Sequence, residues 1–332
     1  MEYLEASQYI VMFALMNCIN VTIKQHHVLT NLLNPVLSRL PSSIRTFVMC
    51  SLCGVLPVPG RVVITSMCLD CTHKPQANTG LLAYISSHHY YLWSPAEKSV
   101  IVCMVGLGIS YSQFIEIMWV PLAIYVIFMV WCAYDTQIAD TISLNSGSRF
   151  VWMDGLMIMT CLMSMVIKPH VMIGEFKLSS IVIAMILMFL YFYCKYRPAI
   201  GEMMKSFEVT SVCVLSVMLM LATYVKHHVD DYDEYIVDQH IFMVCVVSFV
   251  VSFLLGSSSK FSAVCVMCTL MYGMEYFCLF YIVDFCGYLM SPFHKCLPIS
   301  IIKFNTSLTT MYTYLLILCI ILTTYCVVQL NL

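Results

Sequence analysis

The chain is a succession of apolar runs separated by polar stretches that are too short to fold by themselves. The longest polar interruptions are residues 24–43, 135–149 and 226–240, whereas an independent domain needs about 50 residues or more. Residues 1–332 must therefore form one unit. Charged residues make up only 10% of the chain and apolar residues 61%, while a soluble domain is about 25% charged. The pattern predicts an all-α polytopic protein whose surroundings are the lipid bilayer.

The N-terminus carries Glu2 and Glu5 where a cleaved signal peptide would carry Lys or Arg. We therefore expect the first apolar run to be retained, and the protein to be a multi-pass integral protein of the cell (inner) membrane. The net charge of −2 lacks the basic excess that binding to phosphate backbones requires, so no nucleic-acid partner is expected.

We expect about 8–10 membrane helices, and several of the apolar runs are shorter than the roughly 20 residues that cross a bilayer. Short or interrupted runs indicate broken or re-entrant helices that are buried in protein or line a cavity. The expected runs are 9–23, 99–110, 115–133, 155–167, 178–193, 209–225, 241–255, 261–283 and 307–328.

Two apolar runs are broken near their middle. Residues 47–70 contain Pro57, Pro59 and Gly60, and two prolines so placed cannot lie in a regular helix because each removes a backbone donor and clashes with the preceding turn. We expect a re-entrant hairpin over about 44–70; the alternative is one kinked spanning helix. The second break is LLGSSSKF at 254–261, which predicts a second hairpin over about 241–270.

The octet YLWSPAEK at 91–98 is nearly repeated as YLMSPFHK at 288–295, an offset of 197 residues (288 − 91). Gly60 and Lys260, beside the two breaks, are 200 residues apart (260 − 60). Two matching offsets indicate an internal duplication, with a first repeat at 8–134, connecting helices at 135–206 and a second repeat at 207–328. Within the octets, Ser94 and Ser291 precede prolines, and this order is typical of a helix N-cap.

Three segments resemble motifs of an uncharacterised integral-membrane family in the ion transporter superfamily, which also holds gluconate, citrate, dicarboxylate and arsenite carriers. GVLPVPGRVVITS at 54–66 resembles the family's proline-rich hairpin tip, and 85–101 is loosely similar to a second motif. The segment 287–308 is similar to a late motif through Ser291, Pro292, His294, Cys296 and Leu297.

For a diverged member, the resemblance implies an inverted-repeat transporter with two re-entrant hairpins around a central substrate cavity. It also implies a homodimer, since carriers of the superfamily often dimerise. Arg61 stands where the family has a second glycine.

The two hairpin tips are the predicted substrate site. Arg61 and Lys260 would place cations beside helix ends, an arrangement that suits a small anion such as a carboxylate; the alternative is that both heads reach water. The candidate substrate-binding residues are Pro57, Pro59, Gly60, Arg61, Gly256, Ser257, Ser258, Ser259, Lys260, Ser291 and His294.

Glu275 lies within the apolar stretch MYGMEYFCLF and is the candidate ion-coupling residue. Glu116 and Asp284 lie nearer the ends of their runs and are expected at the membrane interface. His294 could titrate near neutral pH or serve as a structural hydrogen-bonding group.

No metal or other cofactor is expected, apart from Na⁺ or H⁺ as a coupling ion. Cys68 and Cys71 with His73 lack a second ligand pair, and the acidic stretch 230–238 fits no recognisable calcium loop. Adjacent histidines such as His88 and His89 point about 100° apart on a helix and rarely chelate one ion unaided.

No enzyme motif of the G-x-S-x-G, H-E-x-x-H or P-loop type occurs in the sequence. The protein is thus expected to be no enzyme but a secondary transporter of a small organic anion, coupled to Na⁺ or H⁺. A transport-inactive membrane scaffold or interaction protein is the alternative, favoured by Arg61 in place of glycine. A third, weaker possibility is an intramembrane metal or thiol protein.

Overall fold

The computed structural model describes residues 2–26, 28, 31–32, 42–55, 62, 65, 77–95, 97–135, 152–167, 170–173, 176–201, 203, 209–228, 241–256 and 258–331. These residues are helical apart from connecting turns and a short antiparallel ribbon of β1 (His170–Ile173) and β2 (Phe176–Ser179). Its register pairs His170 with Ser179 and Ile173 with Phe176. The predicted all-α class is confirmed, with this ribbon as a small addition.

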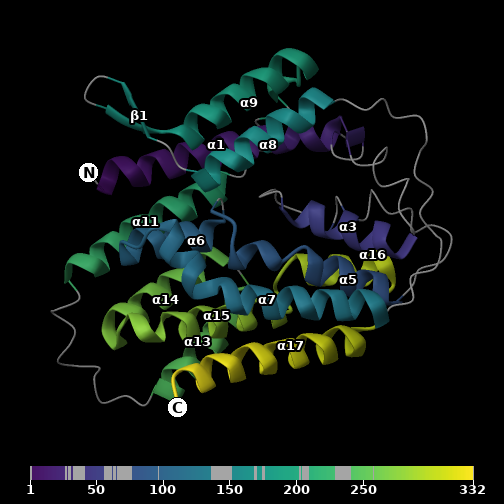
Figure 1. Ribbon diagram of the computed structural model, residues 1–332, viewed down its shortest axis with the longest axis vertical. Helices are drawn as coiled ribbons and strands as arrows, with labels where there is room; N and C mark the ends of the chain where they lie inside the picture. Colours follow the sequence, from purple (N-terminus) through teal and green to yellow (C-terminus); the bar gives the residue numbers. More distant parts are fainter. Residues whose placement is uncertain are drawn as a thin grey trace.

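The helices lie roughly side by side across the long axis of the molecule (Figure 1). The α-helices are α1 (Glu2–Gln25), α3 (Ser42–Val55), α5 (Ala77–Ser86), α6 (Lys98–Leu107), α7 (Tyr111–Asp135), α8 (Trp152–Ile167), α9 (Ser180–Tyr196), α11 (Val209–His228), α13 (Ile241–Leu255), α14 (Ser258–Tyr272), α15 (Phe277–Met290), α16 (Cys296–Phe304) and α17 (Leu308–Gln329). Two short 3₁₀ turns, η1 (His89–Leu92) and η3 (Met274–Tyr276), follow α5 and precede α15.

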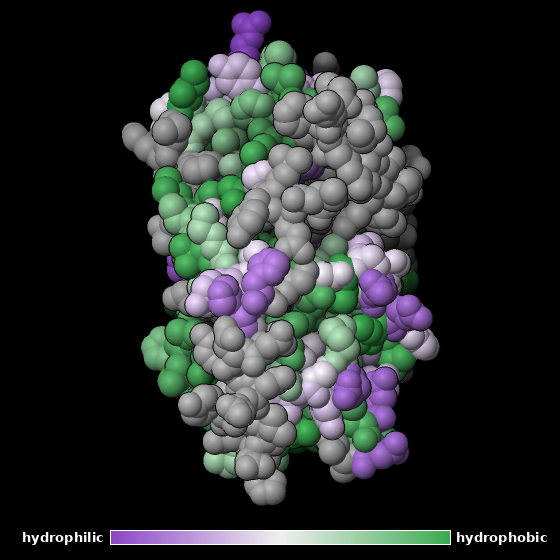
Figure 2. All heavy atoms as spheres, turned by 90° about the vertical axis from the view of Figure 1, so that its left-hand side faces the viewer, coloured by the Kyte–Doolittle hydropathy of each residue, from purple (hydrophilic) through white to green (hydrophobic). Residues whose placement is uncertain are grey.

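Two of the described helices are long and apolar enough to cross a membrane, Tyr111–Tyr134 of α7 and Leu308–Gln329 of α17. Only 33% of each window is buried inside the protein, so neither is a core helix of the kind found in soluble domains. Large apolar side chains such as Ile127 and Val328 are 68% and 67% exposed. On the face in Figure 2, toward which the ends of the helices point, described apolar and hydrophilic residues are interspersed. Exposed apolar side chains of this kind are typical of a surface that contacts lipid or another protein.

Helix α15 is the centre of the lower part of the bundle. Every residue from Phe277 to Leu289 is buried, as expected of a helix that is apolar all round. Helices α13, α14 and α17 pack against it. Around the other octet, α5 contacts α3, α7 and α16. Both octets therefore begin at the ends of well-packed helical segments.

Helix bounds recur at the offset of the two octets, to within one residue. Helices α6 and α7 begin at 98 and 111, and α16 and α17 begin at 296 and 308. Gly108 and Asn305, which are 197 apart, both end a helix in the left-handed conformation, with φ of 67° and 51°. Ser110 and Ser307, at the same offset, each accept a hydrogen bond from the backbone N–H three residues later.

The same offset relates the buried faces of α7 and α17. The buried positions of α17 are Met311, Leu315, Leu318, Cys319, Leu322 and Cys326. Subtracting 197 gives positions 114, 118, 121, 122, 125 and 129 of α7, which are buried except for the half-buried Leu122. Trp131 near the end of α7 contacts Tyr314 near the start of α17, with ring centroids 5.4 Å apart. The two helices thus lie alongside each other in opposite directions (Figure 1).

The predicted helix over 261–283 is wrong in one respect, because Gly273 divides it into α14 and α15. This glycine has φ of +111°, a conformation that L side chains rarely adopt and that ends a helix. The short helices α5 and α16 were not predicted, since their apolar stretches fall well below membrane-crossing length. The predicted run 241–255 matches α13.

Helices α13 and α14 contact each other on either side of Gly256, whose φ is +56°. The second interruption is therefore a break between two packed helices. In the first, α3 ends at Val55, Val62 and Thr65 are buried, and 56–61 lie outside the described residues.

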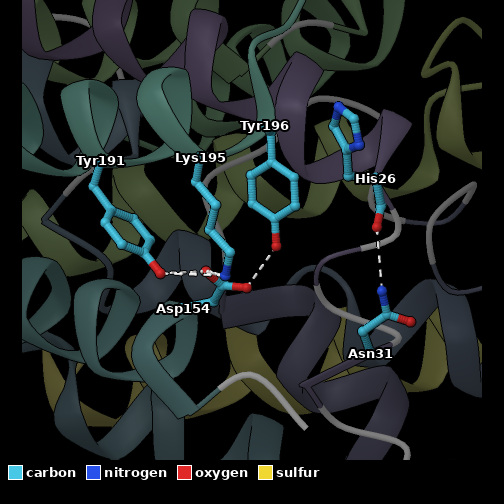
Figure 3. Close-up of polar contacts among 6 residues, drawn as sticks. All are labelled: His26, Asn31, Asp154, Tyr191, Lys195 and Tyr196. Carbon is cyan, nitrogen blue, oxygen red and sulfur yellow. Dashed lines mark hydrogen bonds and ion pairs between the residues drawn. The ribbon is translucent and has the colours of Figure 1, made fainter. Parts of the chain in front are cut away.

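Helices α1, α8 and α9 form a group at the top of Figure 1, joined by a polar cluster (Figure 3). Asp154 in the first turn of α8 is 1% exposed. Its carboxylate accepts hydrogen bonds from Lys195 at 2.6 Å, Tyr191 at 2.9 Å and Tyr196 at 2.6 Å. Tyr196 also stacks on His26 of the turn after α1. One carboxylate thus has several donors from α9, which compensates for its burial.

Gly287 allows α15 to approach α13 closely. A Cβ at this position would lie 2.5 Å from the carbonyl oxygen of Phe249 and 2.9 Å from the Cβ of Ser252. Since a backbone atom blocks the space, a side chain here requires the two helices to separate.

We predict that Gly287→Ala lowers the free energy of unfolding by about 1–3 kcal/mol, the usual cost of overpacking. Thermal unfolding in detergent measures this as a lower Tm. The matched control is Gly201→Ala, because a Cβ at Gly201 meets nothing within 4 Å. Equal Tm values for Gly287→Ala and Gly201→Ala would contradict the close approach of α15 to α13 at Gly287.

Candidate functional site

The two octets meet in the interior. The hydroxyls of Tyr91 and Tyr288, the first residues of the octets, are 2.6 Å apart and share a hydrogen bond. Both side chains are buried, and their ring centroids are 5.0 Å apart. Residues that correspond at the offset of 197 therefore contact each other directly. A two-fold relation between the two segments would produce such a contact between corresponding residues.

Two further tyrosines, Tyr84 and Tyr281, also correspond at this offset and bond across the same interface. The Tyr281 hydroxyl donates to the carbonyl oxygen of Tyr91 at 2.7 Å. The Tyr84 hydroxyl donates to the carbonyl oxygen of Leu289 at 2.7 Å. Each half thus donates to a backbone carbonyl in the octet of the other. Together with the hydroxyl pair, these crossing bonds satisfy polar groups that would be costly to leave unpaired in an apolar interior.

Next to the tyrosines, two histidines from opposite halves face each other. His88 Nε2 and His294 Nε2 are 2.8 Å apart, and the side chains are 2% and 6% exposed. Cys296 Sγ is part of the same group, with all three ligand atoms within 4.8 Å of one another. His89, although adjacent in sequence, accepts from Trp93 Nε1 at Nδ1 and lies against the Ser51 carbonyl at Nε2.

The break at Gly256 packs against the second octet. A Cβ at Gly256 would lie 2.8–2.9 Å from Phe293 C, His294 N and Ser291 Oγ. Ser291 Oγ donates to the Phe253 carbonyl at 2.5 Å and accepts from Phe293 N at 3.2 Å. Three of the predicted site residues, Gly256, Ser291 and His294, are therefore brought together.

The prediction that Ser94 and Ser291 are N-caps is wrong. Ser291 is the C-cap of α15, and α16 begins five residues later with Lys295 as its N-cap. Likewise, α6 begins at Lys98 with Glu97 as its N-cap. Each Ser-Pro pair stands in the turn between two helices, where the Ser291 hydroxyl is occupied by Phe253 and Phe293.

A second polar group lies between α13 and α15, around Asp284. Asp284 is 0% exposed and accepts a hydrogen bond from Ser252 Oγ at 3.2 Å on Oδ1. Among the described residues, its Oδ2 is buried without a hydrogen bond of good geometry, and the Ser248 hydroxyl lies beside the carboxyl. Thiols of α13 and α14 lie close enough to interact electrostatically with the carboxyl, namely those of Cys245, Cys265 and Cys268.

Asp284 is therefore not an interfacial residue, contrary to the expectation from its position near the end of the apolar run. Asp284 and Gly287 are three residues apart and so lie on one face of α15. That face is where α13 comes closest.

Glu275 is exposed and lies in the 3₁₀ turn between α14 and α15. Its carboxyl folds back over Gly273. The predicted helix over 261–283 would place Glu275 in its interior, whereas the break at Gly273 places it at a helix start.

The remaining predicted residues are only partly described. Ser258, Ser259 and Lys260 lie in the first turn of α14. The predicted residues that lie outside the described part of the chain are Pro57, Pro59, Gly60, Arg61 and Ser257. The other predicted hairpin tip therefore contributes no contact to the geometry above.

The sequence analysis did not assign Tyr84, His88, Tyr281 or Asp284 to the functional site. The tyrosines could have been found from the offset, since 84 and 281 differ by 197. Asp284 had a weaker signal: a carboxylate in YIVDFCGYLM with no basic residue within one turn.

We predict that Tyr84→Phe and Tyr281→Phe each lower the free energy of unfolding by about 1–3 kcal/mol, because each leaves a buried carbonyl without its donor. Tyr134→Phe is the matched control, since Tyr134 is 87% exposed. Thermal unfolding of the three variants in detergent compares them. If the Tm of Tyr84→Phe and of Tyr281→Phe equals that of Tyr134→Phe, the crossing hydrogen bonds contribute nothing to stability.

No known protein family matches the chain, and no curated protein has a similar sequence.

Proposed function

We propose that the chain is a secondary carrier of a small organic anion, built from two inverted halves and coupled to Na⁺ or H⁺. The observation that carries this proposal is Asp284, a buried carboxyl with an unpartnered oxygen beside the break of the second hairpin. An ionisable residue in an apolar helix costs about 2.5–3.5 kcal/mol on insertion scales and is therefore kept for function.

The inverted arrangement is supported by the recurrence at 197 residues. Helices related by a two-fold axis parallel to their length would point the same way. Helices α7 and α17 instead lie in opposite directions, with Trp131 against Tyr314, which requires an axis perpendicular to both. If these two helices cross the bilayer, the axis lies in the membrane plane, as in inverted-repeat transporters. This reading keeps the repeats at 8–134 and 207–328 and makes α3 to α7 the counterparts of α13 to α17, in a multi-pass protein.

Asp284 has the surroundings of a cation-coupling residue. The Asp284 carboxyl and the hydroxyls of Ser248 and Ser252 supply oxygen atoms, the ligand type that hard cations prefer. In the apolar interior the carboxyl is stable only when a proton or a cation neutralises it. Helix α13 is followed by Gly256, which packs against the second octet. Binding of a proton or cation at Asp284 would therefore act on the helix that leads to this break.

The anion would lie between the two hairpin breaks. The start of α14 supplies the positive end of a helix dipole and the backbone of Ser258 to Lys260. Gly256 provides a tip without a side chain next to Ser291 and His294. Arg61 is the cation that the sequence places beside the first break.

A transport-inactive scaffold is the second candidate, and the packing between the octets favours it. Tyr91, Tyr288, His88 and His294 fill the interface with hydrogen bonds and ring contacts. A carrier has to open such an interface, whereas a scaffold keeps it closed. Transport measurements decide between them.

We predict that purified protein in proteoliposomes on a solid-supported membrane gives a substrate-dependent current with some member of a panel of small organic acids. Asp284→Asn should remove the dependence of this current on Na⁺ or on the pH gradient, because the amide cannot bind the coupling ion. Glu116→Gln is the matched control, an exposed carboxyl on α7. No current from folded wild-type protein would overturn the carrier and leave the scaffold.

We further predict that Arg61→Ala raises the anion concentration needed for half-maximal current at least about tenfold, the effect of losing one charge-assisted hydrogen bond. Lys303→Ala is the control, an exposed cation in the last turn of α16. Unchanged half-saturation in Arg61→Ala would remove this residue from the site while leaving the role of Asp284 intact.

A further inference from the structure

We propose that His88, His294 and Cys296 form a Zn²⁺ site that joins the two halves of the protein. His88 is more than 200 positions away from His294 and Cys296 in the sequence, yet the three ligand atoms lie within 4.8 Å of one another in the interior. Two imidazoles and one thiolate are a donor set that suits Zn²⁺, and three protein ligands leave a fourth coordination position for water or a hydroxyl.

The hydrogen bonds of His88 prepare its Nε2 as a ligand. Its Nδ1 lies 2.5 Å from the Tyr84 carbonyl oxygen and 3.1 Å from Ser87 Oγ. A carbonyl oxygen only accepts, so in the neutral ring Nδ1 carries the proton and Nε2 carries the lone pair. A ligating histidine usually donates its other ring N–H to a backbone carbonyl in this way.

The distances require only a small adjustment. With Zn–N bonds of about 2.0–2.1 Å in tetrahedral geometry, two ligating nitrogens are about 3.3 Å apart. The present separation of the two Nε2 atoms is 2.8 Å, the length of a hydrogen bond in which His294 donates to His88. For a Zn–S bond of about 2.3 Å, the sulfur of a bound site lies about 3.6 Å from each nitrogen. In the present structure, Cys296 Sγ lies within 4.8 Å of both Nε2 atoms.

Binding exchanges protons for the ion. The Cys296 thiol loses its proton to water, and His294 changes tautomer, with its proton exchanged from Nε2 to Nδ1, so that both nitrogens and the thiolate face Zn²⁺. One proton is released in total, and no redox step is involved. Affinity should therefore fall as the pH is lowered.

The surroundings hold the ligands in place. Tyr84 contacts the His88 ring at 4.4 Å between centroids, and Tyr288 contacts the His294 ring at 4.2 Å. Both tyrosines also bond across the octet interface. An ion here would fix the first half to the second at the point where a two-fold axis passes, independently of whether the protein transports anything.

The test is metal binding by the full-length chain in detergent, stripped with a chelator and titrated with Zn²⁺ against a chromophoric competitor. We expect one ion per chain, a higher Tm with Zn²⁺, and a thiolate-to-metal absorption band when Co²⁺ replaces Zn²⁺. Cys296→Ser should abolish the band, and His88→Gln should weaken Zn²⁺ binding by more than about 100-fold, beyond the effect of an outer-shell change.

The matched controls are Cys194→Ser and His228→Gln, a thiol on α9 and an imidazole on α11 that are remote in sequence from the site. Equal affinity of all variants would identify an adventitious ion only and overturn the site. Absence of binding by the wild type, or a Co²⁺ spectrum without the thiolate band, would do the same. Should His88→Gln fail to fold, the Co²⁺ spectrum of Cys296→Ser still decides, because Cys296 is only partly buried.

Discussion

The arrangement depends on polar groups that satisfy one another inside an apolar interior. Tyr84, Tyr91, Tyr281 and Tyr288 bring hydroxyls into a region where water is not available to pair them. Each finds its partner in the opposite half, either a hydroxyl or a backbone carbonyl. Hydrophobic burial alone would allow the apolar helices to slide, since one apolar face packs on another with little preference for register. The crossing hydrogen bonds fix the register, because a displacement by one residue would leave several buried groups unpaired.

The long apolar helices could be predicted from sequence, whereas the contacts between distant segments could not. The bounds of α13 and α17 follow from uninterrupted apolar runs that end in glycine or a polar residue. Helices α5 and α16 have only 10 and 9 residues, so no periodicity distinguishes them from connecting segments. The break at Gly273 was missed because a glycine inside an apolar run is also compatible with a continuous helix. The positive φ of Gly273 ends the helix, and this backbone angle is visible only in the structure.

The candidate site shows the same division. Gly256, Ser291 and His294 were predicted from a broken run and a repeated octet, and they do come together. The partner of His294 is His88, 206 residues away, and no local pattern connects the two. Glu275 and Asp284 were assigned in the wrong order because position within an apolar run was taken as a measure of depth. A turn at Gly273 exposes the first carboxyl, and the packing of α13 on α15 buries the second.

The crossing bonds are not perfectly equivalent, and this has a consequence for energetics. Tyr281 bonds to residue 91 of the first octet, but Tyr84 bonds to residue 289, one position beyond the counterpart of 91. In a carrier with perfect two-fold symmetry, opening toward one side of the membrane and opening toward the other would produce states that the rotation interconverts and that have equal energy. A slip of one residue removes that degeneracy. For the carrier proposed above, the two openings would therefore differ in energy before any solute or ion gradient acts on the protein.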